Sequence, residues 1–282
     1  MQDNKTKLAV NEIFLSIQGE GRYTGTPSVF VRLNGCNLRC CFAGGSVCDT
    51  PYTSHCPEKS KMMDTDELAK KVVEIVGQIG GSEGNSHIVI TGGEPMLQQE
   101  AILDFLEKLG DDYDCFSPVT IETNGTISPD DKFSKYDVFW SVSPKLGTSC
   151  CFAGTDVPEY MREQHRQKRI NIDALANIIT MSGDDYQLKF VYSGQESVDE
   201  IKSIISLVKD RVRDDLQAGD YIRGIIDIYL EAIDRHIMLM PEGITNEQLT
   251  ASAPGAVQAC IENGWVFCDR AHIRIWGDKR AV

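Results

Sequence analysis

The residues best suited to chemistry in this sequence are cysteines that gather within residues 36–50: Cys36, Cys40, Cys41 and Cys48. Thiolates are soft ligands that favour iron–sulfur clusters, zinc or copper(I). Cys36 and Cys40 can approach one centre from a single loop, and Cys48 can reach the same centre once residues 42–47 loop out. If three cysteines hold a cubane cluster, one iron lacks a protein ligand and can bind another molecule, unlike an electron carrier with four Cys ligands.

Further polar groups lie where expected strands end. Ser-Ile-Gln-Gly-Glu-Gly occupies residues 16–21, Thr-Gly-Gly-Glu-Pro 91–95, Glu-Thr-Asn-Gly 122–125 and Ser-Pro-Lys 143–145. Glycine lets the backbone approach a ligand, and ligands bind outside the carboxyl ends of parallel strands. Each segment alone is also compatible with an ordinary turn. Arg32, within a short β-rich run, is either exposed to solvent or a planar donor for a carboxylate or heterocycle.

The elements that would position these groups alternate between strands and helices. Apolar, β-rich runs predict strands at residues 8–17, 28–33, 87–91, 119–122, 138–142, 187–192, 237–240 and 272–276. Amphipathic patterns predict helices at 64–79, 98–109, 172–181, 197–216 and 246–263, with 225–230 compatible with either and 51–63 expected as a polar loop. The β–α–β–α order predicts an α/β fold with a parallel sheet, an incomplete barrel whose functional residues collect at the carboxyl edge of the strands.

Length, charge and composition limit the classes of protein. With 282 residues the chain can bury a full core, and we expect one domain over 1–282, with a cluster loop at 36–50 and an insertion at about 150–170. The net charge of −14 and the scattered Lys and Arg do not favour nucleic acid as a partner. Without a long apolar run or a signal peptide, we expect no membrane partner. Ten cysteines without a secretory signal favour a reducing cytoplasm and a metal.

Taken together, the motifs resemble a known superfamily. Cys36-x3-Cys40 after Gly35, combined with Thr-Gly-Gly-Glu-Pro at 91–95, resembles the radical S-adenosylmethionine superfamily, whereas Cys-x3-Cys alone is a weak signal. Within it, the chain is similar to the 7-carboxy-7-deazaguanine synthase family, from about residue 10 to the C-terminus. That similarity rests on segments 16–21, 35–40, 48–50, 122–125 and 143–145, on Arg32, and on the ending around His272 and Trp276. It implies an incomplete, TIM-like parallel β/α barrel of the radical S-adenosylmethionine type with insertions.

The sequence departs from the superfamily pattern at the third cluster ligand. In the usual motif two residues separate the second and third Cys, and that place holds Ala43. Cys48 takes the role here, because Asp49 and Thr50 follow it as in the family. The resemblance therefore implies that a 4Fe-4S cluster is held by Cys36, Cys40 and Cys48. Cys41 remains a rival to Cys40 as the second ligand.

The resemblance also implies a reaction and the residues that bind its participants. S-adenosylmethionine would be bound by Val47, Asp49, Gly93, Glu94, Ser143 and Lys145. The pterin substrate would be bound by Gln18, Glu20, Arg32, Thr91, Glu122 and His272, and Mg²⁺ by Thr50. No side chain is expected to be catalytic, because the cofactor carries the radical. The implied enzyme is a lyase that converts 6-carboxy-5,6,7,8-tetrahydropterin to 7-carboxy-7-deazaguanine with loss of ammonia, in the biosynthesis of queuosine and other 7-deazapurines.

The family further implies a flavodoxin or ferredoxin as electron donor, a homodimer and a cytoplasmic location. Two alternatives stay open at this point. One is another radical S-adenosylmethionine enzyme, such as a glycyl-radical activase. The other is a zinc-binding structural protein whose four ligands would be Cys36, Cys40, Cys48 and Cys56. The zinc protein would leave the segment at 91–95 and Lys145 without a role.

Overall fold

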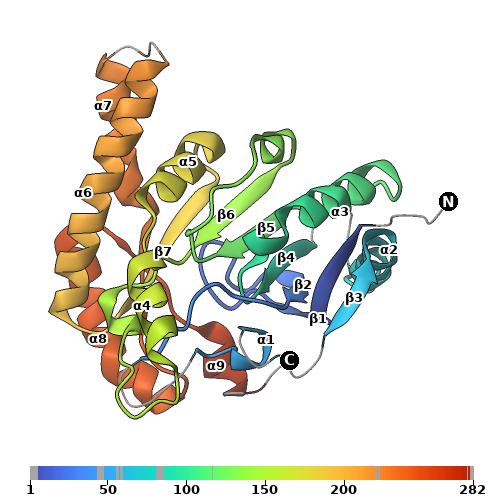
Figure 1. Cartoon of the computed structure of the whole chain (residues 1–282), viewed down its shortest axis with the longest axis horizontal. Coiled ribbons are helices and arrows are strands. Elements are labelled where there is room, and N and C mark those ends of the chain that lie inside the picture. The colour runs from blue at the N-terminus through green and yellow to red at the C-terminus, as the bar shows by residue number, and fades with distance from the viewer. Residues whose placement is uncertain are drawn as a thin grey trace.

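The strands of this protein join into one sheet, which occupies the centre of Figure 1. The computed structural model describes residues 6–42, 48–54, 57, 60–80, 86–115, 117–219, 221, 223–277 and 279. Over these residues the sheet has nine strands in the order β3-β1-β2-β4-β5-β6-β7-β8-β9. Their bounds are β1 (Lys7–Ile17), β2 (Pro27–Leu33), β3 (Lys61–Asp64), β4 (His87–Gly92), β5 (Val119–Thr123), β6 (Val138–Val142), β7 (Tyr186–Tyr192), β8 (Ile237–Pro241) and β9 (Val266–Phe267).

The direction of the strands confirms the predicted fold class. Neighbouring strands are parallel from β2 through β4 to β8 and on to β9. β1 runs antiparallel to both of its neighbours, β2 and β3. Since β3 and β9 lie at opposite edges, the sheet of the described chain is open. The fold is therefore α/β, with a parallel sheet that does not close into a barrel.

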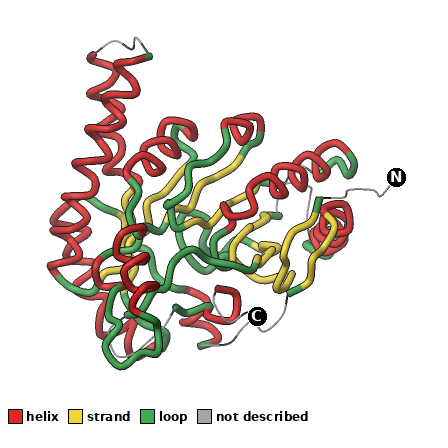
Figure 2. Tube along the Cα trace, viewed as in Figure 1, coloured by secondary structure: helices red, strands yellow, loops and turns green. Residues whose placement is uncertain are grey.

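Helices follow most strands of the parallel part. Their bounds are α1 (Pro51–Ser54), α2 (Thr65–Val76), α3 (Gln99–Asp111), α4 (Glu159–Lys168), α5 (Ile172–Ser182), α6 (Gln195–Ala218), α7 (Arg223–Ala232), α8 (Asn246–Asn263) and α9 (Ala271–Trp276), with short 3-10 helices η2 (Pro95–Gln98), η3 (Asp131–Lys135), η4 (Gly147–Ser149) and η5 (Ile233–His236). Figures 1 and 2 show α3 and α5 on one side of the sheet, with α1, α4 and α9 on the other, and α6 and α7 projecting as a helical hairpin.

Local sequence explains where the helices begin and end. Asp64 caps α2 by accepting a hydrogen bond from the Asp66 amide at 3.0 Å. Thr245 and Gln248 form a capping box at the start of α8, and Gly264 ends that helix in the left-handed region at φ 68°. These contacts satisfy backbone groups that a helix end leaves without partners, and glycine takes the left-handed conformation without a steric penalty.

The core lies between the sheet and the helices that cover it. β6 is buried along its whole length, as expected of a central parallel strand, and Trp140 packs edge-on against Phe133 with 5.3 Å between ring centroids. Along α6 the buried residues recur every three or four positions, which places one apolar stripe against the sheet. This packing fixes the strand ends, where the polar segments lie.

Two sequence-based predictions differ from the structure, and one open alternative is decided by it. Residues 272–276, predicted as a strand, belong to helix α9, in which the Arg270 carbonyl accepts from the amides of Ile273 and Arg274 at 3.0 and 3.1 Å. Ile273 is buried while Ile275 is 57% exposed, whereas a strand would place both on one face. The expected loop at 51–63 contains α1 and begins β3, and residues 225–230, compatible with either element, are helical.

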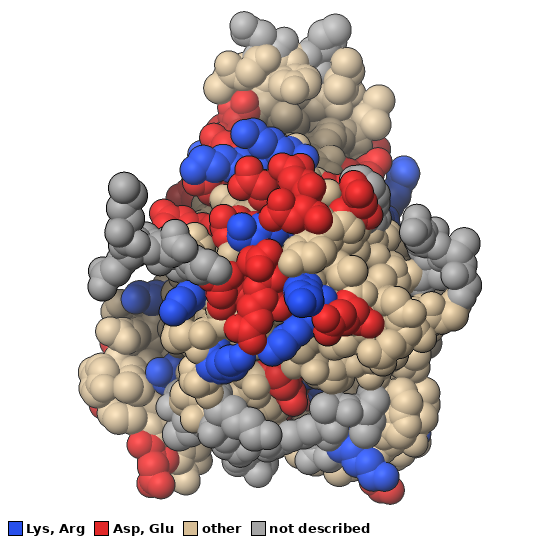
Figure 3. Space-filling view, turned by 90° about the vertical axis from the view of Figure 1, so that its right-hand side faces the viewer, with Lys and Arg blue, Asp and Glu red and all other residues tan. Residues whose placement is uncertain are grey.

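On the face drawn in Figure 3, Lys and Arg are interspersed with Asp and Glu. In the described part of the chain, no helix combines the length and the apolar character needed to cross a bilayer.

Candidate active site

A cavity of about 1090 Å³ lies at the carboxyl ends of the strands and is lined by segments from β1 to α9. Most of the residues predicted from sequence line it: Gln18, Glu20, Arg32, Cys36, Cys40, Cys48, Asp49, Thr50, Thr91, Gly93, Glu122, Ser143, Lys145 and His272. Two predicted residues are not in this set. Val47 lies outside the described residues, as does Cys56 of the zinc alternative. Glu94 is described, but its carboxylate has other partners.

The cysteines divide between two environments. Cys36, Cys40 and Cys48 all line the cavity, and the Cys48 amide donates to the Cys40 carbonyl at 3.0 Å. Cys41 is buried outside the cavity lining, and its amide donates to the Ser149 carbonyl at 2.8 Å. This arrangement favours Cys40 over Cys41 as a ligand directed at the cavity. Burial raises the pKa of Cys36 to about 11 and that of Cys40 further, so a metal centre would displace their protons on binding.

The glycine pair at the end of β4 lets two segments of the backbone pack in direct contact. A Cβ added at Gly93 would lie 2.0 Å from the Gly35 carbonyl oxygen and 3.2 Å from the Cys36 Cβ. The Glu94 amide also donates to the Gly35 carbonyl, at 2.7 Å. The tip of β4 therefore rests directly on the cysteine loop, which only glycine permits. Three cavity-lining thiols beside a backbone surface free of side chains suit a cubane cluster with one open iron.

Glu94 holds the neighbouring strand tip instead of facing the cavity. Its carboxylate, fully buried, accepts from the Met96 amide at 3.0 Å, from the Thr123 hydroxyl at 2.7 Å and from the Asn124 amide at 2.7 Å. Because these contacts occupy both oxygens, the side chain fastens the end of β4 to the end of β5. Its expected contact with S-adenosylmethionine stays a prediction.

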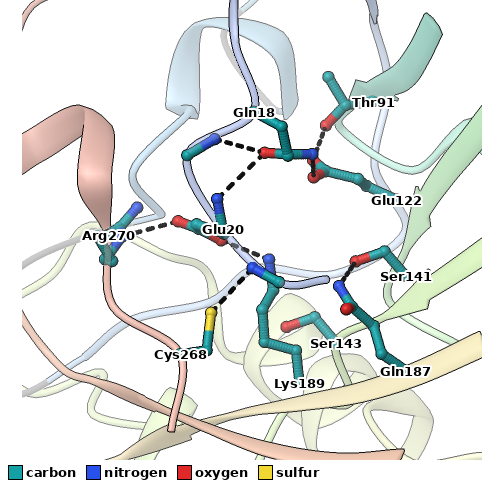
Figure 4. Close-up of polar contacts among 12 residues, drawn as sticks. Gln18, Glu20, Thr91, Glu122, Ser141, Ser143, Gln187, Lys189, Cys268 and Arg270 are labelled. Atoms are coloured by element: carbon teal, nitrogen blue, oxygen red, sulfur yellow. Dashed lines mark hydrogen bonds and ion pairs between the residues drawn. The ribbon is translucent and has the colours of Figure 1, made fainter. Parts of the chain in front are cut away.

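A polar network joins the ends of β1, β4 and β5 (Figure 4). The Gln18 side-chain oxygen accepts from the amides of Gly19 and Glu20 at 2.8 and 3.2 Å. Its amide nitrogen donates to Glu122 at 3.1 Å, and the Thr91 hydroxyl donates to the other Glu122 oxygen at 2.7 Å. Side chains from three separate strands are thereby fixed relative to one another.

A second network in Figure 4 surrounds Glu20 with cations. Lys189 and Arg270 both form ion pairs with its carboxylate, and Arg270 also pairs with Asp49 at 2.8 Å. Burial alone would raise the pKa of Glu20, but Lys189, Arg270 and then His272 hold it well below its ordinary range. Glu20 is therefore an anion, and Arg270 connects it to Asp49 in the cysteine loop.

Arg32 and His272, which were also predicted to bind the substrate, both contact other side chains or backbone of the protein. The Arg32 Nε donates to Glu12 at 2.8 Å, and its guanidinium carbon lies 5.3 Å from the centre of the Phe14 ring. His272 packs against the turn that follows β1, since a Cβ added at Gly19 would lie 2.1 Å from the His272 Nδ1. Burial lowers the pKa of His272, which favours a neutral ring that can donate one hydrogen bond and accept another.

Lys145 and Ser143, two of the residues predicted to bind S-adenosylmethionine, place a cation beside a hydroxyl group. Lys145 donates to the Ser143 hydroxyl at 2.9 Å, and the Ser143 amide donates to the Thr123 carbonyl at 2.8 Å. The Thr50 hydroxyl lies 3.5 Å from the Cys48 sulfur. Lys145 is thus placed where it can neutralise a carboxylate, and Thr50 offers a hydroxyl oxygen near the cysteine loop.

Sequence reasoning missed Lys189 and Arg270. A lysine flanked by Leu188 and Phe190 in a central strand is costly to bury unless it is paired, so Lys189 could have been flagged from its position alone. Arg270 gave no such signal, because the segment after it was predicted as a strand. Gln187 and Ser141 also line this region of Figure 4, joined by a 2.8 Å hydrogen bond.

The open α/β sheet and the cysteine-lined cavity at its carboxyl edge define a class, the radical S-adenosylmethionine enzymes. A 4Fe-4S single cluster domain model matches residues 17–136. The chain is 36% identical to a 7-carboxy-7-deazaguanine synthase of Halobacterium salinarum, covering 96% of this chain and 91% of the relative. It is 34% identical to that of Rhodopirellula baltica, covering 99% and 90%. The chain belongs to the 7-carboxy-7-deazaguanine synthase family.

The likeness extends to a solved structure. The crystal structure of QueE from Escherichia coli matches with a TM-score of 0.51 over 94% of this chain and 95% of that chain, at 23% sequence identity. At that identity the match supports the fold, which agrees with the open parallel sheet.

Proposed function

We propose that this protein is a radical S-adenosylmethionine lyase that converts 6-carboxy-5,6,7,8-tetrahydropterin to 7-carboxy-7-deazaguanine with loss of ammonia. One observation carries the proposal beyond the family match. Cys36, Cys40 and Cys48 line the same cavity as the acidic residues Glu20 and Glu122. A metal site and a surface suited to a polar heterocycle therefore share one space.

Different residues of the cavity bind the cluster and S-adenosylmethionine. Held by Cys36, Cys40 and Cys48, a 4Fe-4S cluster would supply the electron that cleaves the sulfonium of S-adenosylmethionine. Lys145 and Ser143 bind the carboxylate of its methionine part, since they present a cation and a hydroxyl group side by side. Gly93 and Asp49 line the same cavity as Ser143 and Lys145. Val47 keeps its expected cofactor role by resemblance alone.

The substrate side offers complementary polar groups. Gln18, Glu20 and Glu122 provide amide and carboxylate groups for the ring nitrogens and amino group of a pterin. Arg32 and His272 suit the substrate carboxylate, and the Thr91 hydroxyl holds Glu122 in place at 2.7 Å. Thr50 binds Mg²⁺ together with substrate oxygens and water, since magnesium keeps several waters and takes few protein ligands.

The proposed function can be tested by anaerobic reconstitution with iron and sulfide, followed by incubation with S-adenosylmethionine, dithionite and the carboxy-tetrahydropterin. We expect broad visible absorbance that dithionite bleaches, and formation of the deazaguanine chromophore. Cys40→Ala and Cys48→Ala should lose the cluster. The matched control Cys41→Ala should keep it, because Cys41 is buried outside the cavity lining.

Two results would contradict the proposal. A colourless protein that carries zinc would favour a structural metal site. A cluster that survives Cys40→Ala but not Cys41→Ala would overturn the ligand set.

The physiological setting is also proposed. We infer a flavodoxin or ferredoxin as electron donor, because the cluster must be reduced before each cleavage. We further infer a homodimer and a cytoplasmic location, as the family resemblance implies. Light scattering of the purified protein tests the dimer, and reduction by a purified flavodoxin in place of dithionite tests the donor.

A further inference from the structure

The segment that follows β6 holds the cysteine loop in a single parallel bridge. The Cys41 amide donates to the Ser149 carbonyl at 2.8 Å, and the Cys151 amide donates back to the Cys41 carbonyl at 2.9 Å. This segment runs into α4, within the insertion for which the sequence offered no role. Two unusual parts of the chain, the long spacing between Cys40 and Cys48 and the insertion near 150–170, therefore meet in space.

His165 of α4 makes the second contact with the loop. It is 1% exposed, and its Nδ1 lies 3.2 Å from the Arg39 amide nitrogen, one residue before Cys40. Its Nε2 lies 2.9 Å from the Ser149 hydroxyl, which donates to the Leu146 carbonyl at 2.6 Å. Since the Arg39 amide and the Ser149 hydroxyl each have one hydrogen to donate, Nδ1 accepts and Nε2 carries the ring hydrogen. The contacts select one neutral tautomer.

The ring of His165 is itself fixed from its other side. Phe152 packs edge-on against it with 5.6 Å between centroids, and Arg166 lies over Phe152 at 5.6 Å. The Arg39 guanidinium donates to the carbonyls of Cys36 and Leu38 at 2.9 and 2.7 Å. The loop between the first two cysteines is thus braced by Arg39 from within and by His165 from outside.

We propose that His165 is a positioning residue for the cluster ligands, and that η4, α4 and the residues between them form a clamp on the cysteine loop. By accepting from the Arg39 amide, His165 fixes the backbone that directs Cys40 into the cavity. With seven residues between Cys40 and Cys48, the loop has more conformational freedom to lose than the usual spacing of two, so an external clamp reduces the cost of ordering it. This inference rests on the proposed role of Cys40 as a ligand.

The test compares side chains that keep one half of the histidine contact. In His165→Asn the side-chain oxygen can take the place of Nδ1 and accept from Arg39. In His165→Gln the terminal amide can take the place of Nε2 and contact Ser149, but it leaves the Arg39 amide without an acceptor. His165→Leu removes both contacts. His87→Asn is the matched control, because His87 is an equally buried histidine at the start of β4, away from the loop.

The first measurement is amide hydrogen exchange of residues 38–41 in the full-length, metal-free protein. We expect exchange at Arg39 to be about tenfold faster in His165→Leu and His165→Gln than in the unmodified chain, and near normal in His165→Asn and His87→Asn. The second measurement is the iron retained per chain after reconstitution and dilution. We expect less iron in His165→Leu and His165→Gln than in His165→Asn and His87→Asn. If His165→Leu fails to fold, the Asn and Gln variants still decide the matter.

Equal exchange at Arg39 in the Asn and Gln variants would overturn the positioning role. So would iron retention that follows overall stability and is lowered equally by His87→Asn. The exchange measurement needs neither cluster nor substrate. A protein that protects Arg39 through His165 yet forms no deazaguanine would therefore contradict the proposed function and leave the clamp intact.

Discussion

Glu20 shows how a single residue of the site depends on partners distant in sequence. Its carboxylate meets Lys189 from β7 and Arg270 from the segment before α9, both at most 8% exposed. A buried carboxylate is unfavourable by itself, but two cations keep it ionised. The arrangement makes Glu20 a fixed acceptor with its charge already compensated. A neutral polar heterocycle suits such a site better than a third cation would.

The same contacts predict the effect of Lys189→Met on stability. Methionine fills similar space but leaves Glu20 with one buried cation instead of two, so we expect the free energy of unfolding to fall by about 3 kcal/mol. Urea denaturation of the metal-free protein measures it. In Glu20→Gln combined with Lys189→Met, the uncompensated charge is gone, and the loss should be smaller than the sum of the single changes. Strict additivity would show that the pair is not coupled.

At this scale the sequence identified every side chain that joins Gln18, Thr91 and Glu122, but only the acidic partners of Lys189 and Arg270. Gln18, Glu20 and Glu122 were identifiable because each stands in a distinctive segment beside glycine or at a strand end. Lys189 and Arg270 stand in segments without such motifs, and their role follows only from which strand lies beside which. Pairing over more than a hundred residues of sequence is set by the sheet order, which a single sequence does not contain.

At the scale of elements, the site depends on how closely the tip of β4 approaches the cysteine loop. Gly93→Ala would place a methyl group 2.0 Å from the Gly35 carbonyl oxygen, a contact with backbone that no rotamer relieves. We expect this variant to fold, to lose about 2 kcal/mol of stability, and to retain little iron after reconstitution, because the two segments must separate. Urea denaturation and visible absorbance measure the two effects.

Gly110 provides the matched control for Gly93→Ala. It lies in α3, and nothing would lie within 4 Å of an added Cβ. Gly110→Ala should therefore be neutral or stabilise by up to about 1 kcal/mol, and it should leave the cluster unaffected. Normal iron retention in Gly93→Ala would show that the close approach has no bearing on the metal site.

Elements with strong periodicity and caps were predictable, whereas short ones were not. Residues 246–263 form α8 as expected, since a capping residue and a terminal glycine mark both ends. The run His-Ile-Arg-Ile-Trp at 272–276 alternates like a strand but forms α9. Its position is decided by packing against another segment, because the Ala271 amide donates to the Gly19 carbonyl, just past the end of β1, at 2.9 Å. Alternation over five residues does not distinguish the two outcomes.

For the whole molecule, the alternation of strands and helices predicted the parallel part of the sheet but not the reversal at its start. β1 and β2 are joined by only nine residues, and a parallel crossover needs a dozen or more, so an antiparallel pair is the sterically available arrangement. In that pair Ile17 lies beside Pro27, the first residue of β2, so the turn after β1 starts at the amino end of the parallel strands, and Gln18 reaches Glu122 of β5 through its side chain. The contact between Gln18 and Glu122 is a consequence of this reversal.

Buried histidines at two distant places give the whole molecule a predictable response to acid. Burial lowers the pKa of His87 and of His165 from 6.5 to about 4. His87 lies between Ser28 and Thr120 at the start of β4, with Glu122 as the charged group acting on it. The positive charges of Arg169, Lys145 and Arg166 also oppose protonation of His165. Both rings are neutral in the folded state at neutral pH.

The sign of the effect follows from which state binds protons first. As pH falls below 6.5 the unfolded chain protonates these histidines, whereas the folded protein does so only near pH 4, so the free energy of unfolding falls across that window. Each histidine accounts for a loss on the order of 3 kcal/mol. The depressed pKa of Glu20 acts below its ordinary value of 4.5, and so leaves most of the window to the histidines.

Asparagine does not titrate, so the difference in unfolding free energy between the unmodified protein and His87→Asn isolates one histidine. We expect this difference, measured by urea denaturation of metal-free protein, to be constant above pH 7 and to shrink steadily from pH 6.5 toward 4. His165→Asn should behave alike, and the two changes should add, because the histidines lie in separate parts of the fold. A difference that stays constant down to pH 4 would mean that these rings protonate as readily in the folded state as in the unfolded chain.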